Sequence, residues 1–259
     1  MDTQVLKELT YEDFQFVYQP IYALNSWETL GFEALLRTAF AKGQIEELFS
    51  LARRHNYLYK LDTMAIEGAI KHFPFDVLKS EDLFINVFPS TLLHSHFQLF
   101  LTHLLNTYKN AKHRIVWELN ETLHEKILWE SPALFARVMS LKEAGFKIAI
   151  DDFGAGTAAM RQVSMYEPHY MKLDRSYAEG LADCKQKKEK DLIDLLVNYY
   201  PHTNLILEGV ERDKDLAAAI SLNLYAAQGY LLGMPQSISS HLTYNKYRSL
   251  FRRERLLHS

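Results

Sequence analysis

Residues 14–36, FQFVYQPIYALNSWETLGFEALL, decide the fold, because they hold two apolar β-type runs joined by a very short connection. Only residues 23–28 separate the two expected strands. A crossover between parallel strands needs about a dozen residues or more. The first two strands should therefore form an antiparallel hairpin, and the rest of the fold has to accommodate it.

The remainder of the chain alternates short apolar runs with longer helical stretches, which is typical of βαβ units and a parallel sheet. The expected strands lie near 14–21, 29–36, 83–88, 114–119, 147–152, 169–173, 204–208 and 224–229. The expected helices lie near 45–55, 60–72, 91–107, 131–144, 157–164, 186–199, 213–221 and 239–253. Eight such strands in 259 residues predict an α/β protein with a TIM-like (β/α)8 barrel, irregular because its first strand is antiparallel to the second. We expect one domain over residues 1–259, with a core over about 14–238 and a basic C-terminal helix over about 239–253.

The composition is that of a soluble globular protein, with 48% hydrophobic and 24% charged residues. A net charge of −3 gives no electrostatic reason to bind long nucleic acid. No apolar run approaches the roughly 20 residues of a membrane span, and the acidic, polar start MDTQVLKELTYED is not a signal peptide. The single cysteine, Cys184, suits a reducing compartment. We therefore expect a cytoplasmic protein.

Polar side chains fall at or near the ends of the expected apolar strands, one after another along the chain. In (β/α)8 barrels, catalytic groups come from the C-terminal ends of several strands. A carboxylate placed there is unfavourable unless it is paired or binds a metal ion. The residues are Glu33, Asn86, Glu118, Asp151, Asp152, Lys172, Glu208 and Gln228. Each alone has a simpler explanation, such as a core amide, a helix cap or a salt bridge, but the whole series predicts one polar centre at the barrel mouth.

These residue types match Mg²⁺ or Mn²⁺ chemistry, because carboxylate and amide oxygens are hard ligands. A zinc site is disfavoured, since the eleven histidines do not fall at strand ends. The adjacent Asp151 and Asp152 could hold two ions, an arrangement used for phosphodiester cleavage. A nearby lysine, Lys172, could orient the attacking water or stabilise developing charge.

Seven blocks of sequence, in one fixed order, resemble the EAL domain family of cyclic di-GMP phosphodiesterases. The blocks are EALLR (33–37), INV (85–87), ELNE (118–121), DDFGAG (151–156), KLDRS (172–176), EGVE (208–211) and QGYLLGMP (228–235). The resemblance covers roughly residues 14–238. It implies an irregular barrel whose first strand is antiparallel, in agreement with the hairpin.

The resemblance also implies roles for single residues. Glu33, Asn86, Glu118 and Asp151 would hold one divalent ion, and Asp151 with Asp152 would help to hold a second. Lys172 would orient the attacking water, while Glu208 would be either a metal ligand or a proton acceptor. Arg37 would contact a substrate phosphate, to which its guanidinium is well suited. The supporting residues would be Gln228, Glu211 and Pro235 around the substrate and Glu121 beneath the loop after Asp152. The reaction implied is the hydrolysis of cyclic di-GMP to linear pGpG with Mg²⁺ or Mn²⁺, and Glu33, Asp152, Lys172 and Glu208 would be the catalytic residues.

Two departures from the family pattern keep other functions open. Phe88 stands where the family has Ser, and strand alternation points it the same way as Asn86, so it would narrow the mouth. The loop 152–160, DFGAGTAAM, keeps its glycines but has lost most polar side chains of the family pattern. The alternatives are a weak or inactive domain that acts as a cyclic di-GMP receptor, and a protein-binding regulator. The resemblance implies a homodimer, and the family couples this loop to dimer contacts and metal binding, so the altered loop bears on both. A regulatory protein partner is a further expectation.

Overall fold

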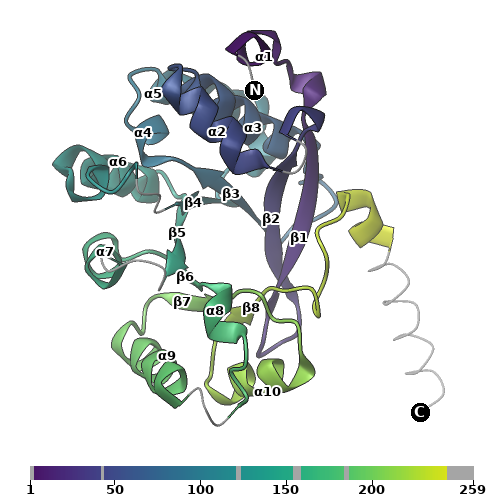
Figure 1. The fold of residues 1–259 in the computed structure, drawn as a ribbon, viewed down its shortest axis with the longest axis vertical. Coiled ribbons are helices and arrows are strands. Elements are labelled where there is room, and N and C mark those ends of the chain that lie inside the picture. The colour runs from purple at the N-terminus through teal and green to yellow at the C-terminus, as the bar shows by residue number, and fades with distance from the viewer. Residues whose placement is uncertain (1–2, 42–43, 121–123, 154–158, 184–186, 244–259) are drawn as a thin grey trace.

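The structure is a computed structural model of the 259-residue chain, and it describes residues 3–41, 44–120, 124–153, 159–183 and 187–243. Eight strands form a closed barrel in chain order, β1 to β8 (Figure 1). The strands are β1 (Gln15–Ala23), β2 (Thr29–Arg37), β3 (Asp82–Val87), β4 (Ile115–Leu119), β5 (Lys147–Phe153), β6 (Tyr170–Leu173), β7 (Asn204–Leu207) and β8 (Ala226–Ala227). The expected TIM-like barrel is therefore confirmed.

The hairpin expected from the short connection is present. β1 pairs antiparallel with β2, with Gln19 opposite Glu33, and the tight turn includes Trp27 at a φ of 60°. From β2 to β8, each strand pairs in parallel with the next one in the chain. The barrel closes where β1 pairs antiparallel with β8 through Tyr22↔Ala227 and Ala23↔Ala226. The first strand thus runs against both of its neighbours.

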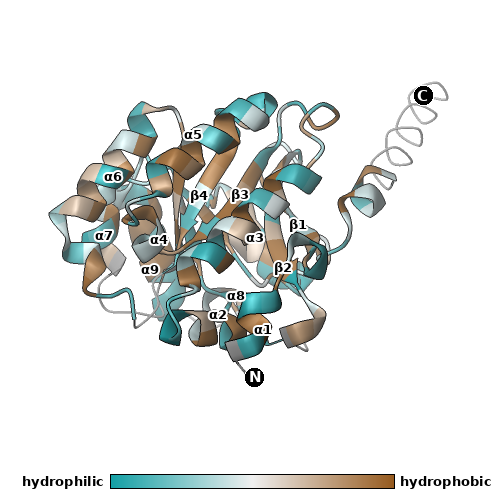
Figure 2. Ribbon diagram, turned by 90° about the horizontal axis from the view of Figure 1, so that it is seen from above, coloured by the Kyte–Doolittle hydropathy of each residue, from teal (hydrophilic) through white to brown (hydrophobic). Residues whose placement is uncertain are grey.

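Helices cover the outside of the barrel in the order that the sequence predicts, with additions. The helices are α1 (Thr3–Glu8), α2 (Ile45–Arg54), α3 (Leu58–His72), α4 (Pro89–Leu92), α5 (Phe97–Thr107), α6 (Pro132–Glu143), α7 (Ala159–Tyr166), α8 (Arg175–Ala178), α9 (Lys187–Tyr199) and α10 (Asp213–Ser221). Short 3-10 turns lie at Tyr11–Asp13, Ala39–Ala41, Lys109–Ala111 and Leu128–Glu130. In Figure 2 the strands at the centre are largely brown, while the surrounding helices carry both brown and teal residues.

One expected helix is wrong, because residues 91–107 form two helices, α4 and α5, with a turn between them. Leu92 and Phe97 are both fully buried. In one continuous helix, residues five apart would point about 140° away from each other. The turn at 93–96 lets both side chains reach the same core.

Two short helices were not expected. α1 packs Leu6, with Leu9 just beyond its end, into a small apolar cluster with Leu48 of α2. α8 begins where the Asp174 carboxylate accepts the backbone N–H of Ser176. Of the expected C-terminal helix 239–253, residues 239–243 are described, within a helical stretch at 238–243. The basic residues beyond 243 lie outside the described residues, as does Cys184. Among the described helices, none combines the length and apolarity required to cross a membrane.

Apolar side chains fill the inside of the barrel away from its C-terminal mouth. Ile21, Phe84, Val116, Tyr170 and Ile206 form a buried cluster there. Beside it, at the first residues of their strands, Lys147 donates to Asp82 at 2.6 Å. The barrel is therefore packed rather than open, and the polar strand-end residues lie at the opposite end.

Candidate active site

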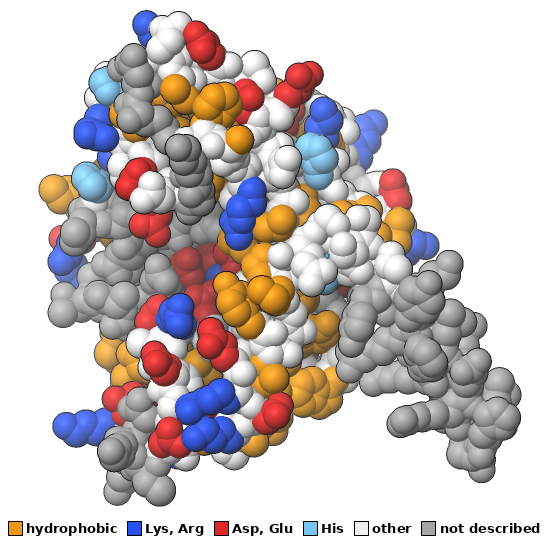
Figure 3. Space-filling model, turned by 45° about the vertical axis from the view of Figure 1, so that its right-hand side comes forward, with side chains coloured by type: hydrophobic (Ala, Val, Ile, Leu, Met, Phe, Trp, Pro, Cys, Tyr) orange, Lys and Arg blue, Asp and Glu red, His pale blue; other side chains and the backbone are white. Residues whose placement is uncertain are grey.

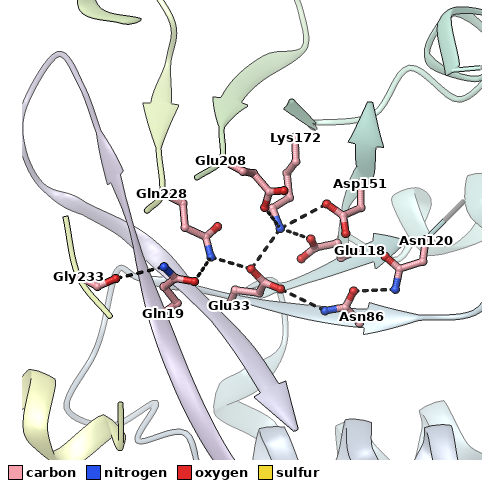
Figure 4. A network of polar contacts seen from close by, with 10 residues as sticks. All are labelled: Gln19, Glu33, Asn86, Glu118, Asn120, Asp151, Lys172, Glu208, Gln228 and Gly233. Carbon is pink, nitrogen blue, oxygen red and sulfur yellow. Dashed lines mark hydrogen bonds and ion pairs between the residues drawn. The ribbon is translucent and has the colours of Figure 1, made fainter. Parts of the chain in front are cut away.

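The polar residues expected at the strand ends converge on one point at the mouth of the barrel (Figure 4). They come from successive elements: Glu33 from β2, Asn86 from β3, Glu118 from β4, Asp151 from β5, Lys172 from β6, Glu208 after β7 and Gln228 after β8. Their position follows from strand geometry, since alternate side chains of each strand face the barrel axis. The mouth is seen in Figure 3 as a hollow where acidic side chains gather.

Lys172 lies at the centre of the group with its side chain 1% exposed. Its Nζ is 2.6 Å from Glu208 Oε1, 3.2 Å from Glu33 Oε2 and 3.5 Å from Asp151 Oδ1, and it also pairs with Glu118 Oε1. Burial alone would lower the pKa of this ammonium, but the four carboxylates raise the pKa well above its usual value. Lys172 is therefore a permanent buried cation.

The carboxylates do not share one charge state. Burial raises the pKa of Glu208 to about 8, although Lys172 opposes the shift. Burial also raises the pKa of Glu118 well above its usual value, and the neighbouring carboxylates add to this effect. Burial would raise the pKa of Glu33 as well, but Lys172 and hydrogen bonds from amides bring that pKa below its usual value. The centre thus combines Glu33, whose pKa lies below its usual value, with Glu118 and Glu208, whose pKa values lie above theirs.

Amide side chains orient Glu33 from two sides. Gln228 Nε2 donates to Glu33 Oε2 at 2.6 Å, and Asn86 Nδ2 donates to Glu33 Oε1 at 3.3 Å. Behind them, Gln228 Nε2 also donates to Gln19 Oε1 at 3.1 Å, and Asn120 Nδ2 donates to Asn86 Oδ1 at 2.7 Å. Sequence reasoning missed Gln19 and Asn120. Gln19 could have been identified from the expected hairpin, because the register of β1 and β2 places it directly opposite Glu33.

A divalent cation fits the oxygen atoms of this group. Glu33, Glu118 and Glu208 each offer a carboxylate oxygen, and these oxygens lie within 4.8 Å of one another. Three buried oxygens of this group accept no hydrogen bond: Glu118 Oε2, Gln228 Oε1 and Asp151 Oδ1, the last of which lies 3.5 Å from Lys172 Nζ. Buried acceptors normally have a partner, so these oxygens are suited to bind a cation or a water molecule. The all-oxygen donor set is the kind that hard divalent cations take.

A pocket of about 510 Å³ opens from Glu33, Asn86 and Asp151 towards α2 and α3. Its outer part is lined by Arg37, Phe49, Arg53, Phe88, Asn120 and His124, among others. Arg37 lies on the wall and is exposed, and its Nη1 donates to the carbonyl of Leu36 at 2.8 Å. The pocket therefore joins the acidic centre to a rim that carries two arginines.

Two buried acids outside the expected set hold the loop after β3, and sequence reasoning missed both. Asp62 of α3 accepts the backbone N–H of Phe88 at 3.1 Å, and burial raises the pKa of Asp62 to about 7. Glu125 is fully buried and accepts the N–H of Ser90 at 2.7 Å and its hydroxyl at 2.8 Å. These contacts fix the direction in which Phe88 enters the pocket.

The remaining expected residues lie away from the centre or outside the described part. Glu211 is 53% exposed at the rim, where one of its oxygens is 4.0 Å from Arg175 Nη2. Pro235 is half-buried and precedes Gln236, which forms a bridge with Tyr18 of β1; it is not among the described residues that line the pocket. Asp152 belongs to β5, but its side chain is not described. Glu121 and residues 154–158 of the altered loop lie outside the described residues.

Comparison with known proteins gives one consistent result. The family model described as "EAL domain" matches residues 3–235. The chain is 29% identical over 232 residues to the probable cyclic di-GMP phosphodiesterase PdeI of Escherichia coli, covering 86% of this chain and 29% of PdeI. It is 25% identical over 244 residues to the cyclic di-GMP phosphodiesterase PdeA of Borreliella burgdorferi, covering 90% of this chain and 35% of PdeA. The chain thus spans about a third of the length of these relatives.

Solved structures agree on the fold. The EAL enzyme Bd1971, in its form with cAMP and cyclic di-GMP bound, superposes with a TM-score of 0.82 at 21% identity, over 93% of this chain and 67% of that one. The manganese and cyclic di-GMP complex of BlrP1 from Klebsiella pneumoniae superposes with a TM-score of 0.74 at 24% identity, over 88% and 57% of the two chains. At these identities the likeness shows a shared architecture.

Proposed function

The chain belongs to the EAL domain family, and from that premise we propose that it is a metal-dependent phosphodiesterase that hydrolyses cyclic di-GMP to linear pGpG. Relatives that are 25–29% identical to this chain are named cyclic di-GMP phosphodiesterases, one of them as probable. The observation that carries the proposal is the buried centre, in which Lys172 meets four carboxylates beside oxygens that lack hydrogen bonds. Burying charged side chains costs free energy, and groups with perturbed pKa values that cluster in this way are typical of functional sites.

The residues that would hold the ion are Glu33, Asn86, Glu118 and Asp151, and Glu208 adds an oxygen to the same group. Asp151 and Asp152 together would hold a second ion. Bound Mg²⁺ or Mn²⁺ would polarise the scissile phosphate and acidify a water molecule. Asn86 and Gln228 would keep the Glu33 carboxylate in one orientation, since both donate to it.

The side chains of the centre would place the water and move its proton. Glu208 would either bind the ion or, in its ionised form, accept the proton of the attacking water. Burial raises its pKa to about 8, so as a base it would become more effective as the pH rises towards 8. Lys172 stays charged and would stabilise the negative charge that develops on the phosphate oxygens. The water oxygen bonds to phosphorus while the bond from phosphorus to one ribose 3′ oxygen breaks. That oxygen takes up a proton, and the product is linear pGpG with a 5′ phosphate.

On the substrate side, Arg37 at the pocket rim would bind a phosphate oxygen through its guanidinium. This requires its Nη1 to exchange the Leu36 carbonyl for the ligand. Gln228 would position the scissile group through its free oxygen. Glu211 and Pro235 would support the substrate from the segments that follow β7 and β8.

The test is direct product analysis. The protein is incubated with cyclic di-GMP and Mg²⁺ or Mn²⁺, and linear pGpG is separated by chromatography. Product should form with the metal and not with a chelator. Glu33→Ala should abolish turnover, while Glu8→Ala, an exposed change on α1, should leave it intact. Failure to form pGpG with either ion would contradict the proposal.

A cyclic di-GMP receptor is the second candidate, and Phe88 favours it. This ring lines the pocket beside Asn86, where the family pattern has a small hydroxyl side chain. If it prevents the scissile phosphate from reaching the centre, calorimetry will show tight cyclic di-GMP binding while no product forms. Phe88→Ser should then restore turnover, and clear turnover by the unmodified chain would exclude this candidate.

A further inference from the structure

The outer wall of the mouth pocket holds an arginine stacked on aromatic rings. Arg53 Cζ of α2 lies 5.2 Å from the centre of the Phe88 ring. The rings of Phe49 and Phe88 have centroids 5.3 Å apart and are tilted by 53°. All three residues line the pocket. Phe49 and Arg53 lie outside every motif block of the family, and Phe88 is itself a departure from the family pattern.

The guanidinium of Arg53 is held in place and still reaches the pocket. Its Nη1 forms an ion pair with Glu125, which is fully buried, and the arginine side chain is 23% exposed. Glu125 is itself fixed by the N–H and hydroxyl of Ser90. An arginine carries five N–H donors, and among the described contacts of Arg53 the pair with Glu125 uses only Nη1. The other N–H donors of Arg53 are therefore held in one orientation and remain available to a ligand.

This combination suits a guanine base better than a phosphate. Guanine offers two adjacent acceptors, O6 and N7, which match an arginine fork, whereas adenine has an amino donor where guanine has O6. Aromatic and guanidinium planes also stack with bases. A phosphate would gain nothing from Phe49 and Phe88, and Arg37 already provides an exposed guanidinium at the end of β2.

We infer that Arg53, with Phe88 and Phe49, forms a subsite for one guanine base, and that Arg53 makes the chain select guanine over adenine dinucleotides. The inference rests on the proposed function, because it assumes a cyclic dinucleotide in this pocket. Phe88 and Phe49 provide the stacking surface, and Arg53 binds the O6 and N7 edge. Glu125 acts as a positioning residue that keeps the fork in the pocket.

The experiment compares the affinities of two cyclic dinucleotides for the protein by calorimetry in a chelator, where no hydrolysis is expected. The ligands are cyclic di-GMP and cyclic di-AMP, which carry the same phosphates. Arg53→Lys keeps a charge for Glu125 but loses the fork, so it should weaken cyclic di-GMP binding about 10- to 100-fold and change cyclic di-AMP binding little. The matched control is Arg54→Lys, an exposed neighbour on α2 that does not line the pocket, and its affinities should equal those of the unmodified chain.

Two further measurements keep the inference independent of how one variant folds. A cyclic di-GMP analogue with 7-deazaguanine lacks one acceptor and should bind the unmodified protein more weakly. Phe88→Leu removes the aromatic face and should weaken both dinucleotides to a similar extent. An equal loss for both dinucleotides in Arg53→Lys would indicate a phosphate contact and overturn the inference.

The outcomes also separate this inference from the proposed function. If the unmodified protein hydrolyses cyclic di-GMP while Arg53→Lys keeps the guanine preference, only the inference is wrong. If the analogue binds as well as cyclic di-GMP, the inference is wrong too. If the unmodified protein neither binds nor hydrolyses cyclic di-GMP, the proposed function and the inference both fail.

Discussion

Replacing Lys172 by Met should destabilise the metal-free protein strongly, because it removes the cation at the centre of four carboxylates. Met has a similar length and no charge, so the change leaves the volume of the site nearly intact. The lysine is 1% exposed and contacts Glu33, Glu208 and Asp151 within 3.5 Å, as well as Glu118. Removing one partner of a buried ion pair typically costs about 3–5 kcal/mol, because the other charge stays buried without compensation.

The free energy of unfolding lost in Lys172→Met should increase as the pH rises. Without Lys172 the carboxylates can avoid repulsion by taking up protons, and burial already raises the pKa of Glu208 to about 8. Acids whose pKa is raised in the folded state bind more protons there than in the unfolded state. Stability then falls as the pH rises. The difference between Lys172→Met and the unmodified protein should therefore be larger at pH 8 than at pH 6.

The assay is chemical denaturation in a chelator, repeated with Mn²⁺ or Mg²⁺. A cation that binds only the folded state adds about 2.7 kcal/mol to the free energy of unfolding when its concentration is a hundred times its Kd. The gain should be larger in Lys172→Met, where no ammonium competes for the same oxygens. Lys147→Met is the matched control, since Lys147 pairs with Asp82 at the other end of the barrel, where its side chain is 35% exposed. The control should lose less stability and should respond to the cation as the unmodified protein does.

Two results would refute this reasoning. One is a Lys172→Met variant as stable as the unmodified protein in the chelator, which would mean that the ammonium does not balance the carboxylates. The other is a cation-dependent gain no larger than that of the unmodified protein, which would mean that the ion and Lys172 use different oxygens.

Three other changes test the surroundings of the site. Asp62→Asn should weaken the pH dependence of stability. The pKa of Asp62 is raised to about 7 in the folded state, so its contribution falls by about 1.4 kcal/mol between pH 6 and pH 8, and denaturation at the two pH values should show a fall smaller by this amount in the variant. Gly229→Ala should destabilise the protein and weaken metal binding, because a Cβ would lie 2.2 Å from the backbone of Val210 and displace the adjacent Gln228; unchanged calorimetric metal affinity would count against this role. Leu6→Ala should cost about 2–5 kcal/mol, since this side chain is 2% exposed; a melting temperature equal to that of the unmodified protein would show that α1 does not stabilise the barrel.

The barrel could be predicted from local patterns, and its exceptions could not. The short 23–28 connection requires a hairpin whatever surrounds it, and the structure confirms it. The division of 91–107 into α4 and α5 depends on where Leu92 and Phe97 are buried, which only the packed core determines. The burial of Leu6 likewise depends on α2, a distant segment of the chain.

The same distinction holds within the site. Residues at the ends of parallel strands must meet at one mouth, so Glu118 and Lys172 could be placed together from their positions in the sequence. Asp62 and Glu125 come from a helix and a turn, and their contact with the loop after β3 depends on how those segments pack. The role of Arg53 could not be predicted for a similar reason, because its partner Glu125 is far away in the sequence.

The antiparallel closure of the barrel has a consequence for how the chain acquires its fold. β1 finds one partner at once, because β2 follows directly in the hairpin. Its other edge pairs only with Tyr22↔Ala227 and Ala23↔Ala226, so it waits for nearly the whole chain to be synthesised. An open strand edge is a template for association with other chains, and contacts so distant in sequence form late. During synthesis, one edge of β1 therefore stays unpaired until β8 has emerged, and in this interval the partly folded chain is most prone to aggregation.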